Sequence, residues 1–316
     1  MILHEFPDLQ WLKSQIKHRF ANRIGWGNHR LETEGFPNVI IHATTKKAYR
    51  PDVKGPLSLF LNIKGNSLCK VDNHTVKVDE PFYFVSNRFQ PYTLEIEREQ
   101  PVETFNIHFG EHFSEGVLHA LTTDADRILD GADQRGGGEG VIFFNKLYPR
   151  DGEFNRIIGE IYRCSMEGSA DRFLLEEQLT QLLTYLLRQH RHILRTVEGL
   201  PSAKRSTRVE LYKRLSHSLD QLHADFGGGL SLDVLAATAC LSKYHFLRLF
   251  KSTYGQSPHQ YLQQVRLAKA RELLQHSSLS VADIADAVGF ENSPSFSRLF
   301  FQRQGIYPSQ YREQVK

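Results

Sequence analysis

The chain has 316 residues, a formal net charge of +3 and three cysteines. This length suggests two domains, each large enough to bury a core. The cysteines show neither metal-site spacing nor a disulfide pattern, which fits a reducing cytoplasm. The amino-terminal segment is charged throughout, unlike a secretory signal, and no apolar run is long enough to cross a membrane. We therefore expect a cytoplasmic protein without a membrane partner.

The first half of the sequence is typical of β-structure. Six short runs are rich in β-branched and aromatic residues, and turn residues separate them. The runs cover residues 57–63, 68–71, 74–78, 82–85, 92–96 and 104–109. Short strands at this spacing predict a sandwich or a small barrel, here over residues 25–112.

Two helices should follow a glycine-rich loop at residues 131–140. The first spans residues 153–166 and the second residues 172–194. The second helix carries a leucine stripe with two interpretations, packing against the chain's own sheet or forming a seam with a second subunit. The stripe consists of Leu175, Leu179, Leu182, Leu183, Leu186 and Leu187.

A polar and basic segment, residues 197–208, has the composition of an interdomain linker. It divides the chain into an amino-terminal domain, residues 1–196, with a helical part at 151–196, and a carboxy-terminal domain, residues 209–316. Residues 208–316 hold 13 basic against 9 acidic side chains, whereas residues 1–207 hold 26 against 27. The modest basic excess therefore lies in the second domain.

The last hundred residues contain one pattern twice, about fifty residues apart. The matching pairs are Phe246 and Phe296, Phe250 and Phe300, Gly255 and Gly305, Pro258 and Pro308, and Tyr261 and Tyr311. Each copy predicts a short helix (residues 232–239 or 281–288), a turn, and a second helix that ends at a glycine C-cap. A repeat of this size is usually one supersecondary unit used twice. The order of its elements is that of a helix-turn-helix.

The second helix of each copy has an apolar and a polar face. Spacing places Phe246, Leu249 and Phe250 in the core, and Phe296, Leu299 and Phe300 in the second core. A recognition helix enters the major groove and reads base edges from its outer face. The expected base contacts are Tyr244, Leu247, Arg248, Ser293, Pro294, Ser297 and Arg298. The expected phosphate contacts are Lys243, Lys251 and Arg303. Ser242 and Asn292, the expected N-caps of the two helices, are also assigned to the DNA-binding surface.

An arginine on an exposed helix face is often only solvated. Arg248 and Arg298, however, occupy the same position in both copies, two residues after the core phenylalanine. This recurrence favours a contact with double-stranded DNA. The helix expected at residues 258–275 joins the two units and would span about 27 Å, close to the ~34 Å of one DNA turn. It could hold both recognition helices over successive major grooves.

Residues 209–316 resemble the AraC/XylS family of bacterial transcription regulators. The resemblance rests on Ile284, Ala285, Gly289, Phe290, Phe296, Arg298, Phe300, Gly305, Pro308, Tyr311 and Arg312, and on Arg266 and Leu267 in the joining helix. It implies a seven-helix DNA-binding module with two helix-turn-helix units. Two residues depart from the family pattern. Phe301 replaces a frequent lysine, and Pro294 restricts the first turn of its helix, so the second unit should read fewer bases.

The first half resembles, more loosely, the cupin-like sensor domain of the same family. The fold class expected is therefore α+β with two domains: a cupin-like β-barrel or sandwich with flanking helices, and an all-α module. The resemblance implies a small effector in the barrel. Candidate ligand-binding residues are Trp26, Tyr83, Arg88, Tyr92 and His108. The histidines are scattered and form no ligand pair, so we expect neither a metal nor another cofactor.

The preferred function is an effector-controlled transcription regulator rather than an enzyme. Its expected partners are double-stranded DNA, a small-molecule effector and a second copy of the chain, with RNA polymerase as a further candidate. Two alternatives stay open. The first half could be a metal-dependent cupin enzyme tethered to DNA, or a domain that dimerises without sensing a ligand.

Overall fold

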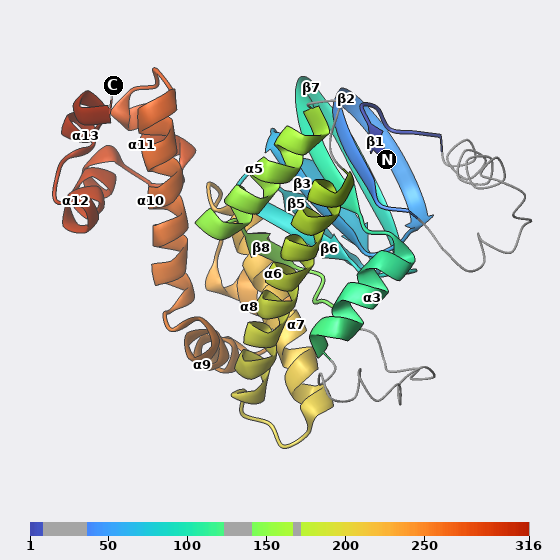
Figure 1. The fold of residues 1–316 in the computed structure, drawn as a ribbon. Helices are drawn as coiled ribbons and strands as arrows, with labels where there is room; N and C mark the ends of the chain where they lie inside the picture. The colour runs from blue at the N-terminus through green and yellow to red at the C-terminus, as the bar shows by residue number, and fades with distance from the viewer. Residues whose placement is uncertain (9–36, 123–140, 167–171, 316) are drawn as a thin grey trace, which may run out of the picture. The chain divides into compact units, whose positions relative to one another are not determined.

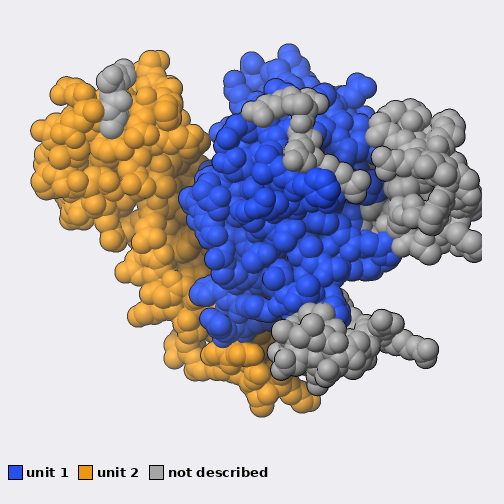
Figure 2. Space-filling model, in the orientation of Figure 1, with its two compact units in different colours: residues 1–195 blue, residues 196–316 orange. Residues whose placement is uncertain are grey.

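The computed structural model describes residues 1–8, 37–122, 141–166 and 172–315. The chain divides into two compact units, Met1–Arg195 and Thr196–Lys316, which Figure 2 colours separately. None of the described helices is long and apolar enough to cross a membrane. Trp26 and the predicted loop at residues 131–140 lie outside the described residues.

The first unit is built on one mainly antiparallel sheet (Figure 1). Its described strands are β1 (Ile2–Leu3), β2 (Val39–Lys54), β3 (Ser58–Lys64), β4 (Ser67–Val71), β5 (His74–Val78), β6 (Phe82–Ser86), β7 (Pro91–His108) and β8 (Leu147–Pro149). They follow the order β1-β2-β7-β3-β6-β8, while β4 pairs with both β5 and β7. The short β1 is the one parallel neighbour in this described sheet. A sheet-rich first unit is thus confirmed.

The two longest strands differ from the sequence prediction. β7 joins the runs predicted at 92–96 and 104–109, because its polar middle, including Glu97 and Glu103, pairs with β2. β2 itself was not predicted, since Lys46, Lys47 and Pro51 interrupt its apolar pattern. Two irregularities in register, one of them around Pro51, accommodate these residues.

Helices complete the first unit. They are α3 (Glu111–Thr122), α5 (Gly152–Met166) and α6 (Arg172–Glu198), of which α3 was not predicted from the sequence. Figure 1 shows α5 and α6 on one face of the sheet. There Tyr83 of β6 stacks against Tyr148 and Phe154, with ring centroids 5.1 and 4.2 Å apart.

The leucine stripe of α6 follows the first of its two interpretations. Five of its leucines are buried within the single chain, from Leu179 and Leu182 at 0% exposure to Leu187 at 4%. Tyr185 of the same helix packs on Phe154 of α5. Because the stripe is already covered, it offers no apolar seam to a second subunit.

The second unit is helical (Figure 1). Its helices are α7 (Arg205–Asp225), α8 (Leu232–Thr238), α9 (Lys243–Tyr254), α10 (Pro258–His276), α11 (Val281–Ala287), α12 (Ser293–Gln304) and α13 (Pro308–Val315). Residues 199–204 separate α6 from α7. The non-helical connection is therefore shorter than the predicted linker at 197–208, because α7 begins inside it.

Long helix α10 contacts both halves of the second unit. It meets α9 near its start, and α11 and α13 farther along (Figure 1). A capping box between Ser257 and Gln260 begins this helix, with Pro258 in its first turn. Its Leu267, Ala270 and Leu274 pack in a core with residues of α11 and α12, among them Ile284, Ala285, Phe296 and Phe300.

Candidate nucleic-acid interface and ligand cavity

Helices α8 and α11 end in the same hydrogen-bonded turn. In the first copy the Leu241 amide donates to the Ala236 carbonyl and Cys240 donates to Ala237, both at 2.9 Å. The second copy repeats the pattern with Phe290 and Gly289 as donors to Ala285 and Asp286. This is a Schellman turn, whose residue after the C-cap adopts a left-handed conformation. Gly289 does so at φ 86°, whereas Cys240 does so at φ 51° with a side chain.

The following helices α9 and α12 begin and end as the sequence indicates. The Ser242 hydroxyl accepts from the His245 amide, and the Asn292 side chain accepts from the Ser295 amide. Gly255 and Gly305 end the two helices with φ of 74° and 77°. These conformations suit glycine because it has no Cβ. Each recognition-helix candidate is therefore fixed at both ends by a local interaction.

Their apolar faces are buried as predicted, with Phe246, Leu249, Phe250, Phe296 and Phe300 each at 0% exposure. Leu299 is half-buried and packs on the second core. The opposite faces are open to solvent. The exposed residues among those expected to contact DNA are Ser242, Lys243, Tyr244, Leu247, Arg248, Lys251, Asn292, Pro294, Arg298 and Arg303, whereas Ser293 and Ser297 are half-buried.

The cations on these faces differ in their pairing. Lys243 Nζ lies 2.5 Å from Asp233 Oδ1 of α8, so this ammonium already has a carboxylate partner. Within the part of the chain that the structure describes, Arg248 and Arg298 form no ion pair and no side-chain hydrogen bond. Their guanidinium groups keep all their donors for an external partner such as a base edge or a phosphate.

An aromatic pair stands beside the second candidate helix. Phe301 of α12 stacks on Tyr307, with ring centroids 4.6 Å apart and planes 26° apart. Both side chains are exposed, at 42% and 49%. From the sequence, Phe301 was expected only to remove the phosphate contact of a lysine. The structure adds Tyr307 to this surface. Helical spacing did not indicate the contact, because Tyr307 follows the end of α12 and lies six residues after Phe301.

Arg266, which the resemblance singled out, has a structural position. Its Nε donates to the Phe226 carbonyl at 2.8 Å and its Nη2 to the Gly228 carbonyl at 3.2 Å. The guanidinium also lies 5.7 Å from the centre of the Phe290 ring. Partial burial lowers the pKa of Arg266, which remains charged because an arginine pKa is so high. The residue ties α10 to the loop after α7 and to the second turn.

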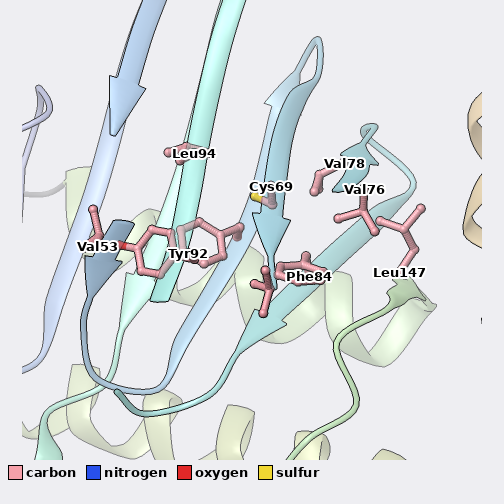
Figure 3. Packing of buried hydrophobic residues seen from close by; sticks show 10 residues of the cluster. Val53, Cys69, Val76, Val78, Phe84, Tyr92, Leu94 and Leu147 are labelled. Carbon is pink, nitrogen blue, oxygen red and sulfur yellow. The ribbon is translucent and has the colours of Figure 1, made fainter. Parts of the chain in front are cut away.

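A cavity of about 300 Å³ lies in the first unit, lined by residues of β2, β3 and β7 and by the amino-terminal segment. Its lining is Phe6, Pro7, Val39, Ile41, Arg50, Asp52, Val53, Lys54, Gly55, Pro56, Phe60, Tyr92, Leu94, Asn106 and His108. Figure 3 shows Val53, Tyr92 and Leu94 within the apolar cluster that continues this lining into the sheet. About 300 Å³ is at the small end of natural ligand pockets.

The polar wall of this cavity contains a neutral histidine. His108 Nδ1 lies 2.8 Å from Ser58 Oγ, and this hydroxyl donates its one hydrogen to the Pro56 carbonyl at 2.8 Å. Nδ1 must therefore carry a proton and donate to Ser58. Burial, helped by the charge of Arg50, lowers the pKa of His108 to about 4. The imidazole is thus uncharged at neutral pH, and its Nε2 is a hydrogen-bond acceptor.

The predicted ligand-binding residues separate into three groups. Tyr92 and His108 line the cavity. Tyr83 packs in the aromatic stack under α5, and Arg88 forms an ion pair with Glu115, so neither is part of this lining. Trp26 lies outside the described residues. Sequence reasoning missed Arg50, Phe60 and Asn106. Across the described segments, no three histidine, cysteine or acidic side chains gather as a metal site would require.

Helix α10 thus joins two helix pairs, α8 with α9 and α11 with α12, and each pair has a short turn of the helix-turn-helix kind. Residues 235–314 match the family model described as a helix-turn-helix domain. The MmsAB operon regulatory protein of Pseudomonas aeruginosa is 40% identical over 105 residues, 32% of this chain and 34% of that protein. The transcriptional activator RhaR of Escherichia coli is 34% identical over 158 residues, 50% of this chain and 52% of RhaR.

Two solved structures also match parts of this chain. An AraC-type DNA-binding regulator from Chromobacterium violaceum is 33% identical and covers 32% of this chain and 91% of its own, with a TM-score of 0.31. A structure of ToxT from Vibrio cholerae with bound unsaturated fatty acid is 12% identical over 88% of this chain and 96% of that one, with a TM-score of 0.34.

The carboxy-terminal domain of this chain is therefore a helix-turn-helix domain that is similar to those of named transcriptional regulators. The chain spans about a third to half of the length of the curated relatives that it matches.

Proposed function

We propose that this chain reads a specific DNA sequence with α9 and α12 and regulates transcription in response to a small molecule bound in the first unit. The observation that carries the proposal is the pair of exposed, unpaired arginines, Arg248 and Arg298, at matching positions on two helices with buried opposite faces. A free guanidinium binds guanine bidentately in the major groove.

The length of α10 supports simultaneous use of both helices. Its 19 residues span about 28 Å at 1.5 Å per residue. Successive major-groove faces lie about 34 Å apart. We therefore propose that the two helices enter adjacent major grooves. The antiparallel sheet of the first unit supports a cupin-like sensor domain, and a second copy of the chain would supply paired half-sites.

The test is selection of bound duplexes from a random pool with the full-length chain. We expect an enriched site with two short conserved segments about one helical turn apart. Arg248→Ala and Arg298→Ala should each cost about 1–3 kcal/mol and relax preference at one segment. Glu313→Gln, an exposed change on α13, is the matched control and should leave both segments intact.

Two outcomes would contradict the proposal. An absence of any enriched sequence would show that the chain does not read DNA specifically. Equal weakening on every sequence by the two arginine variants, with a shallower salt dependence, would show that the arginines only hold phosphates.

A further inference from the structure

One cavity in the first unit combines apolar walls with a cation whose donors are mostly unused. Arg50 is half-buried on β2 and lines this cavity. One guanidinium nitrogen donates to the Pro7 carbonyl, and the group lies 5.9 Å from the centre of the Phe6 ring. A guanidinium has five N–H donors. Among the described residues no carboxylate forms an ion pair with Arg50, so most of these donors are open to a ligand.

The remaining charges limit the charge of that ligand. Lys54 and Asp52 line the same cavity and are exposed, and their opposite charges offset each other. His108 is neutral at physiological pH and adds no positive charge. The lining therefore carries a net charge of about +1, located on Arg50. A single negative charge matches it, whereas a dianion such as a phosphate ester would leave one charge uncompensated beside Asp52.

The deeper wall offers a second polar contact. Asn106 is 1% exposed, and its Nδ2 has no hydrogen-bond partner although its Oδ1 accepts from Thr104. The register places Asn106 and His108 two residues apart on β7, opposite Ile41 and Val39 of β2. A buried amide without a partner costs roughly 1–3 kcal/mol. This cost would be relieved by a ligand oxygen that accepts from Asn106.

The rest of the lining selects for an apolar body. Phe60 and Tyr92 pack with ring centroids 4.8 Å apart, and Val53, Leu94 and Ile41 extend the apolar wall. A dry apolar cavity of about 150 Å³ is large enough to bind benzene. The space of about 300 Å³ therefore has room for a ring or a short chain with two substituents.

We propose that this cavity binds a small organic monocarboxylate, with the carboxylate on Arg50, the apolar body against Phe60 and Tyr92, and a hydroxyl or other oxygen at Asn106 and His108. This inference rests on the proposed function, for which it names the class of effector. Of the residues that line the cavity, only Tyr92 and His108 were predicted from the sequence. Arg50 and Asn106 were not, because only the pairing of β2 with β7 brings them to the same cavity.

The experiment compares acids with their neutral amides on the full-length chain. The probes are phenylacetate, para-hydroxyphenylacetate, cyclohexanecarboxylate and hexanoate, each at millimolar concentration beside the matching amide. Binding is followed by thermal unfolding and by calorimetry, because a ligand of the folded state raises stability with its concentration. We expect at least one acid to bind and its amide to bind at least about tenfold more weakly, a difference of about 1.4 kcal/mol.

Variants localise the binding. Arg50→Gln should remove the preference for acid over amide, and Arg50→Lys should keep part of it because the charge remains. Lys46→Gln is the matched control, since Lys46 is exposed on the same strand but does not line the cavity. If Arg50→Gln fails to fold, the comparison of acids with amides on the natural chain still decides the charge preference.

The outcomes separate the two proposals. No binding by any acid, or equal binding of acids and amides, overturns the carboxylate proposal whatever the DNA result. If Lys46→Gln weakens binding of the acids as much as Arg50→Gln does, the assignment to this cavity is overturned. If the acids bind as expected but the selection recovers no DNA sequence, the cavity assignment stands and the regulatory function fails.

Discussion

Replacing Gly289 by alanine should destabilise the second helix-turn-helix unit strongly. An added Cβ would lie 2.8 Å from Arg266 Nη2 and 2.9 Å from the Gly227 carbonyl oxygen. The guanidinium cannot move away easily because it is held by the carbonyls of Phe226 and Gly228. The left-handed backbone at φ 86° costs alanine about 1–2 kcal/mol, and the steric conflict about 1–3 kcal/mol. We expect a net loss of about 1–5 kcal/mol, since alanine recovers up to about 1 kcal/mol through the unfolded state.

Urea unfolding of the full-length chain measures this loss. Circular dichroism follows the transition, because the second unit is helical. Gly289→Ala should lower the urea midpoint of this dichroism transition.

Gly229→Ala is the matched control, because a Cβ at Gly229 meets no atom within 4 Å. A loss for Gly289→Ala within about 0.5 kcal/mol of this control would refute the steric argument, since surface changes fall in that range. The double variant with Arg266→Ala sharpens the test. Because Arg266→Ala removes the guanidinium, the double variant should lose at least about 0.5 kcal/mol less free energy of unfolding than the sum of the two single variants.

Two further predictions concern single residues. Cys240→Gly should raise the free energy of unfolding by up to about 1 kcal/mol in the same urea assay, because Cys240 adopts a left-handed backbone at φ 51° that glycine adopts without strain. A lower free energy of unfolding in this variant would contradict the prediction. Burial lowers the pKa of His108 from 6.5 to about 4, so the unfolded chain binds its proton first and stability falls as the pH drops through this window. Between about pH 7 and pH 5, the free energy of unfolding of the chain with His108 should fall by about 2 kcal/mol more than that of His108→Gln. Equal pH profiles for the two chains would refute this prediction.

The helix-turn-helix repeat was predictable because its features are local. Phe246 and Phe296 lie one or two turns from the other apolar residues of their helices, so helical spacing alone places them in the core. Gly255 and Gly305 occupy the left-handed position that ends a helix. None of these interpretations needs knowledge of a distant segment, and the structure confirms each of them.

The sheet was less predictable because its strands depend on distant partners. β2 carries Lys46, Lys47 and Pro51, which resemble a loop until β7 supplies the backbone partners. The cavity was hidden for the same reason. Arg50 and Asn106 are 56 positions apart in the sequence, and only the register of β2 with β7 brings them to one wall.

The two copies of the repeat share a framework but differ on their outer faces. The first presents Tyr244, Leu247 and Arg248, of which Tyr244 is 77% exposed. In the second, Pro294 occupies the first turn and Phe301 stacks on Tyr307. Compared with α9, α12 therefore has Pro294 in place of the Tyr244 hydroxyl and Phe301 in place of the Lys251 cation. We infer that α9 carries more of the base discrimination, so Arg248→Ala should change sequence preference more than Arg298→Ala does.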